Sequence, residues 1–101
     1  MIAREKINLD TSIPMVKVVV DIDSKILSYG CELHIDCADE LLANGSKSAD
    51  LWGANIFPAE KRVDYVSMIN IRPQDNNRSM EIKLPDIQTR VEEIIKLWII
   101  F

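Results

Sequence analysis

The feature that most constrains the fold is a run of β-branched residues near the start of the chain. Between Met15 and Ile22, valine or isoleucine fills most positions. β-branched side chains favour extended backbone, and a run this dense is typical of a strand covered on at least one face. The sequence therefore predicts a central strand. Asp21 to Lys25 has the composition of a turn, so a second strand is expected from Ile26 onward, forming a hairpin.

That second strand leads into residues 29–37, which hold the only histidine and both cysteines. If this stretch is a strand, its side chains alternate between two faces. Glu32, His34 and Asp36 then share one face. Such a trio could bind a metal or form an acid–base pair, because a carboxylate beside histidine raises its pKa. The alternative is a wetted sheet face, where alternation places polar residues automatically.

Cys31 and Cys37 lie on the opposite face of the same predicted strand. Six positions on a strand span roughly 20 Å, far beyond the reach of a disulfide. Two reduced core thiols are therefore expected. Together with a start, residues 1–6, that lacks the apolar core of a signal peptide, this favours a cytoplasmic protein.

Composition narrows the class of protein further. The chain has 101 residues, of which 48% are hydrophobic, and a formal net charge of −4. This size and apolar content predict one folded domain over residues 1–101, with 1–14 as an extended arm. The basic residues are scattered, which argues against nucleic-acid binding. No apolar run approaches the roughly 20 residues of a membrane span.

Five further elements follow from the pattern of apolar residues, prolines and turn residues. Asp36 can cap a short helix over 37–43, although Asn44-Gly45 could alternatively be a hairpin turn. The expected elements are strands over 51–57, 62–72 and 80–83, a short helix over 37–43, and a C-terminal helix from Pro85. The predicted fold class is α+β, an antiparallel sheet of about four to five strands packed by the C-terminal helix.

The C-terminal helix carries an apolar stripe, and it should cover one face of the sheet. The stripe consists of Ile87, Val91, Ile94, Ile95 and Trp98. The chain then ends in Leu97 to Phe101, which is apolar almost all round. This end is either buried in the monomer or joins a partner, so a homodimer formed through this helix is one hypothesis.

A second polar group surrounds the loop after Pro73. Asn70 and Arg72 precede the loop, and Asn77 and Arg78 follow it. Guanidinium groups suit carboxylates or phosphates, and amides fix orientation, so a small anionic ligand is one interpretation. The other is that the arginines pair with nearby acids while the asparagines hold turns. Both stay open.

Four stretches in order resemble a small family of prokaryotic domains of unknown function. They are ELHID at 32–36, LL at 41–42 with GSK at 45–47, LWGAN at 51–55 with Pro58, and SMINIRP at 67–73 with NRS at 77–79. The resemblance runs from about Val16 to the C-terminal helix. It implies no activity, cofactor or catalytic residue. Family members carry a helix-like segment near the start, where this chain has only Leu9 to Pro14.

Three functional hypotheses follow, and none of them specifies a cofactor. The first is a binding module with a pocket for a small polar or anionic ligand, which Asn55 completes. Its candidate residues are Glu32, His34, Asp36, Asn55, Asn70, Arg72, Asn77 and Arg78. The second is a small hydrolase-like enzyme, with His34 as base and Glu32 or Asp36 as orienter or metal ligand. The third is the homodimer without a small-molecule site.

Overall fold

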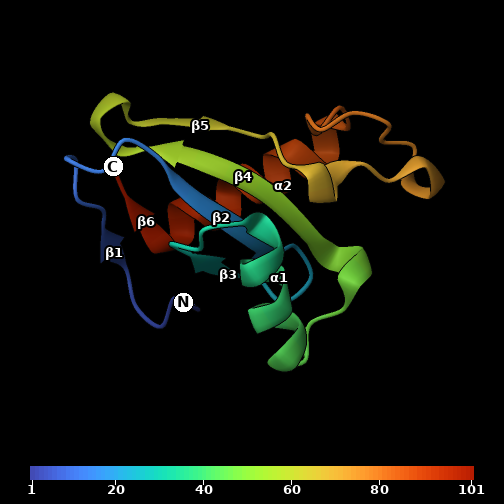
Figure 1. Ribbon diagram of the computed structural model, residues 1–101, viewed down its shortest axis with the longest axis horizontal. Helices are drawn as coiled ribbons and strands as arrows, with labels where there is room; N and C mark the ends of the chain where they lie inside the picture. Colours follow the sequence, from blue (N-terminus) through green and yellow to red (C-terminus); the bar gives the residue numbers. More distant parts are fainter.

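The valine-rich run forms strand β2 (Val16–Asp21), inside a four-stranded antiparallel sheet (Figure 1). In the computed structural model, which describes residues 1–101, β2 pairs with β3 (Ile26–Tyr29) on one side and β4 (Leu51–Phe57) on the other. β5 (Arg62–Asp64) completes the order β3-β2-β4-β5. The α+β class, the hairpin and the strand over 51–57 are confirmed.

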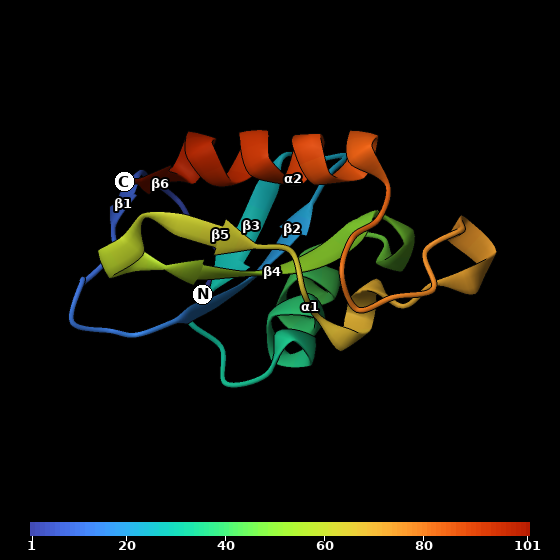
Figure 2. The same cartoon turned by 90° about the horizontal axis from the view of Figure 1, so that it is seen from above.

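The two helices lie on opposite faces of this sheet, as Figure 2 shows. Helix α2 (Pro85–Trp98) packs on one face, and α1 (His34–Ala43) on the other. Because strand side chains alternate, Val18 and Val20 belong to the apolar cluster under α2, whereas Val19 belongs to the cluster under α1. The C-terminal helix begins at Pro85 as predicted, since proline suits a first helical position. Its apolar stripe is the face that packs on the sheet.

The chain ends pair with each other beside this sheet. β6 (Ile99–Ile100) lies parallel to β1 (Ile7–Asn8), so the N-terminal arm is extended, contains a short strand and forms no helix. Ile99 is buried in this way. Three neighbouring apolar side chains stay exposed: Leu97, Ile100 and Phe101. Burial within the monomer therefore accounts for only part of the apolar C-terminal end.

The predicted strand over residues 29–37 is wrong. β3 ends at Tyr29, Gly30 has a φ of 78°, and helix α1 begins at His34. Leu33 is the residue before the helix, and Asp36 lies in its first turn, where its carboxylate accepts a hydrogen bond from the Leu33 N–H at 3.3 Å. The predicted helix therefore exists but starts three residues earlier. Asn44 and Gly45 end it as expected, with φ of 101° at the glycine.

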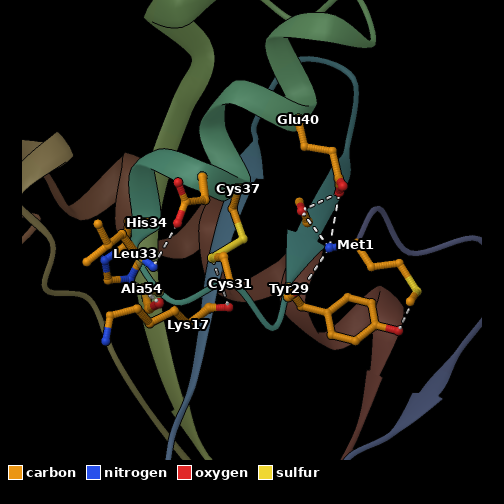
Figure 3. The surroundings of a disulfide bond; sticks show 11 residues. Met1, Lys17, Tyr29, Cys31, Leu33, His34, Cys37, Glu40 and Ala54 are labelled. Carbon is orange, nitrogen blue, oxygen red and sulfur yellow. Dashed lines mark hydrogen bonds and ion pairs between the residues drawn. A yellow bond between two sulfur atoms is a disulfide. The ribbon is translucent and has the colours of Figure 1, made fainter.

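The prediction of reduced thiols is also wrong, because it depended on that strand. Cys31 and Cys37 form a disulfide, with their Cα atoms 5.7 Å apart (Figure 3). The loop before α1 turns back on the first helical turn, which brings the two sulfur atoms together. Disulfides persist mainly in oxidising compartments. The cysteine argument for a cytoplasmic location is therefore removed.

The long strand expected over residues 62–72 is mostly absent. Only Arg62–Asp64 pairs with β4, and the predicted strand over 80–83 is reduced to an isolated bridge between Val66 and Glu81. Polar side chains that bond to nearby backbone compete with strand pairing here. The rest of this region forms turns and short 3-10 helices. The chain's four 3-10 helices are η1 (Ser48–Asp50), η2 (Pro58–Glu60), η3 (Met68–Asn70) and η4 (Pro73–Asp75).

Candidate functional site

A groove opens on the α1 face of the sheet because α1 has only ten residues and covers part of that face. The helix packs over Val19 and Leu51 through Cys37 and Leu41. Farther along the same face, the sheet side chains face a cavity of about 390 Å³ between the start of α1 and η3. This size is within the range of small-molecule sites.

The walls of the groove are apolar and its floor is polar. Leu33 and Ile35 form one wall at the start of α1, and Met68, a residue that is 74% exposed, belongs to the opposite wall on η3. The other apolar lining residues are Met15, Val66, Ile69 and Met80. Methionine side chains adapt their shape to a bound group. Exposed apolar side chains gathered around a concave surface are typical of a binding site.

His34 lies at the edge of this floor, held by the first turn of α1 (Figure 3). Its Nε2 lies 2.9 Å from the Ala54 carbonyl oxygen, which can only accept, so Nε2 carries the proton. Burial lowers the pKa of His34, and the Lys17 charge lowers it further, against the opposing effects of Ala54, Asn55 and Asp64. These surroundings therefore favour the neutral form of the His34 ring.

Asn55 contributes the other half of the floor and has an unpaired atom. Its Nδ2 donates to Asp64 Oδ1 at 2.9 Å and to the Val66 carbonyl at 3.0 Å. Both partners are acceptors, which fixes the orientation of the amide. The Oδ1 atom is buried and has no hydrogen-bond partner of good geometry, although the Asn55 side chain lies close enough to the His34 ring to raise its pKa, and the residue is 8% exposed. A buried acceptor without a partner costs about 1–3 kcal/mol, so it is a feature that a ligand donor can relieve.

The two carboxylates that were predicted to share a face with His34 lie outside the groove. Glu32 is exposed in the loop before α1, and exposed Asp36 binds the Leu33 amide. His34 shares no strand face with either of them, because the stretch is a loop and a helix. No group of three or more His, Cys, Asp or Glu side chains is arranged to hold a metal ion.

Asn70 and Asn77 are buried and bond to backbone on all sides. Asn70 acts as a substitute strand partner for Gly53: its Oδ1 accepts from the Gly53 N–H at 2.8 Å, and its Nδ2 donates to the Gly53 carbonyl at 2.9 Å. Asn77 donates to the Asn70 carbonyl at 2.7 Å and accepts from the Lys83 N–H at 2.7 Å. These amides hold the segment that forms the η3 wall.

The two arginines of the predicted anion site separate. Arg72 is buried, donates to the Ala49 carbonyl at 2.9 Å, and stacks 4.0 Å from the centre of the Trp52 ring. Asp75 lies 3.9 Å away, as the ion-pair interpretation expected. Arg78 is exposed. Of the eight predicted site residues, only His34 and Asn55 line the groove.

Sequence reasoning missed the other polar groups of the floor. Lys17 faces the groove opposite Asn55, and Ser67 sits above Gly53, where an added Cβ would lie 2.7 Å from its Oγ. One signal existed: Lys17 is the only charged residue between Met15 and Val20. A cation within a β-branched run marks a position where the sheet face is open.

The fold and the groove define the class as a small α+β domain with one partly covered sheet face. The chain belongs to the family described as "Protein of unknown function (DUF5674)", whose sequence profile matches residues 3–98. This agrees with the resemblance to a family of unknown function and extends it toward the N-terminus. No curated protein and no solved structure matches the chain. Neither helix has the length and apolar character needed to cross a membrane.

Proposed function

We propose that this domain is a binding module that takes a small amphipathic ligand in the groove between α1 and η3. The observation that carries the proposal is the unpaired Oδ1 of Asn55 on the floor of an apolar cavity. An apolar group of the ligand contacts the methionine-lined walls, and a ligand N–H or O–H donates to Oδ1. The ligand thus removes apolar surface from water and satisfies a buried acceptor at once.

The cation that serves an anionic group of the ligand is Lys17. Arg72 is engaged by backbone and by Trp52, and Arg78 lies outside the groove. Lys17 lines the groove and is half-buried. An anionic substituent on an otherwise apolar ligand therefore fits this site.

The proposal is tested with 8-anilinonaphthalene-1-sulfonate, a fluorescent probe with apolar rings, an N–H donor and a sulfonate. We expect saturable binding to the folded protein. Met68→Ser should weaken binding about fivefold, because removal of about 1 kcal/mol of apolar contact changes affinity by that factor. Met68 is 74% exposed, so the substitution should leave folding intact.

Leu97→Ser is the matched control. Leu97 is 52% exposed on α2, on the far side of the sheet from the groove. This variant should bind the probe like the wild type. Equal weakening by both substitutions, or an absence of saturable binding, would contradict the proposal.

The two remaining hypotheses stay predictions. An enzyme based on His34 needs a partner carboxylate, and the ring instead bonds the Ala54 carbonyl through Nε2. A homodimer through the C-terminal helix would use Leu97, Ile100 and Phe101, whose side chains are exposed. Removal of residues 98–101 should then dissociate it in analytical ultracentrifugation.

A further inference from the structure

A row of three polar side chains crosses three adjacent strands, and two of its members, Lys17 and Asn55, line the groove. Lys17 on β2 is the register partner of Asn55 on β4, and Asn55 is the register partner of Asp64 on β5. Adjacent strands lie about 4.8 Å apart, so the cation and the carboxylate flank the amide at roughly 10 Å from each other. The charge therefore changes along this row from positive at Lys17, inside the groove, to negative at Asp64, beside the groove.

The central amide is polarised along this row. Asp64 accepts a hydrogen bond from Asn55 Nδ2 at 2.9 Å. A carboxylate bound to the N–H side of an amide strengthens the carbonyl on its other side as an acceptor. The unpaired Oδ1 of Asn55 is therefore suited to a cationic donor such as an ammonium group, and the nearby Asp64 charge favours that cation.

We propose that the groove binds a free α-amino acid with an apolar side chain. This inference rests on the proposed function and names its ligand class. The ammonium donates to Asn55 Oδ1, and the carboxylate pairs with the Lys17 ammonium. The apolar side chain lies between Leu33 and Met68.

An α-amino acid matches the spacing of these groups better than an amine or an acid alone. Its ammonium and carboxylate share one carbon, and side chains directly opposite on paired strands have Cβ atoms about 5 Å apart. Lys17 and Asn55 can thus reach both charges of one ligand. The methionine-lined walls accommodate apolar side chains of different shapes, so leucine, methionine and phenylalanine should all bind.

Calorimetric titration of the whole protein with three probes tests this inference. L-Phenylalanine carries both charges, 3-phenylpropanoate lacks the ammonium, and 2-phenylethylamine lacks the carboxylate. L-Phenylalanine should bind at least tenfold more tightly than either analogue, since a charge-assisted hydrogen bond is lost with each group. Equal binding of L-phenylalanine and either analogue would overturn the inference.

Lys17→Met provides the second measurement, because it keeps an apolar stem and removes the charge. This variant should bind L-phenylalanine at least tenfold more weakly than the wild type, and its affinity for 2-phenylethylamine should stay within twofold of the wild-type value. Lys47→Met, which changes an exposed lysine outside the groove, should alter neither. An unchanged affinity of Lys17→Met for L-phenylalanine overturns the assignment of the carboxylate.

The two proposals fail in different ways. If the naphthalene probe binds at the groove and none of the three phenyl probes does, the amino-acid inference is overturned and the binding module stands. If the naphthalene probe also fails to bind, both are overturned.

Discussion

Replacement of Asn70 by alanine should destabilise the fold more than any change on the exposed surface. The side chain pairs with the Gly53 N–H at 2.8 Å, the Gly53 carbonyl at 2.9 Å and the Met80 carbonyl at 3.1 Å. Asn70 is fully buried, so Asn70→Ala leaves the Gly53 N–H and carbonyl without partners, while the Met80 carbonyl keeps the Ser67 N–H at 3.0 Å. At about 1–2 kcal/mol for each of these two buried unpaired groups, the free energy of unfolding should fall by about 2–4 kcal/mol. This is a large share of the 5–15 kcal/mol typical of a domain.

Urea denaturation followed by tryptophan fluorescence measures this loss. Asn44→Ala is the control, because Asn44 is exposed at the end of α1, and it should change stability by less than about 0.5 kcal/mol. Asn70→Asp keeps the acceptor for the Gly53 N–H but sets a carboxylate oxygen against two carbonyls, so it should cost at least as much as the alanine. A loss below about 1 kcal/mol in Asn70→Ala would refute the idea that this amide replaces a strand at the edge of β4.

Three further predictions concern the floor of the groove and the loop before α1. Burial lowers the pKa of His34 below its ordinary value of 6.5, so below that pH the unfolded chain binds a proton more readily than the folded one. The free energy of unfolding is therefore unaffected by His34 above pH 6.5 and falls as the pH drops below it. Urea titrations from pH 7 to 5.5 should show this decline, and His34→Gln should remove the part of it that comes from His34. An identical dependence of stability on pH in both proteins would contradict the lowered pKa of His34. Reduction of the disulfide between Cys31 and Cys37 should lower the free energy of unfolding by about 2 kcal/mol, the entropy of closing so short a loop. Free thiols titrated in the native protein without reductant would contradict this. Gly53→Ala places a Cβ 2.5 Å from Ser67 Cβ and should cost about 1–3 kcal/mol in urea denaturation, with part regained in the double variant Gly53→Ala, Ser67→Gly. If the stability losses of the two single substitutions simply add in the double variant, the contact between the residues at positions 53 and 67 is contradicted.

The central strands and the C-terminal helix were predictable because their signals are local. β-branched density identifies β2, and Pro85 with the apolar stripe behind it identifies α2. In both cases the side chains that form the pattern are the ones that pack into the core. Their burial and their local backbone preference act in the same direction.

The stretch around His34 was misread because period 2 and a helical start both fit its short pattern. Glu32, His34 and Asp36 alternate with apolar residues, as on a half-exposed strand. The disulfide and the hydrogen bond from the Leu33 amide to Asp36 favour the loop and helix instead. Neither contact leaves a clear signal in a single sequence.

Only two residues of the groove could be predicted from the sequence, because the groove exists where α1 leaves part of the sheet face uncovered. His34 and Asn55 were chosen for their chemistry, and both line the groove. Asn70 and Asn77 were chosen for the same reason, yet they hold backbone in place. Amides in a structural role and amides at a ligand site look alike in sequence, and only an unpaired atom such as Asn55 Oδ1 separates them.

The most direct test of the groove is a nitrogen-15 NMR titration that follows the side-chain amide of Asn55. With added 8-anilinonaphthalene-1-sulfonate, the largest shifts should fall on that side-chain amide and on the backbone amides of Leu33 to Ile35 and Ser67 to Ile69, which form the two walls. Shifts centred on α2 around Leu97, with an unchanged Asn55 side chain, would contradict the assignment of the ligand site.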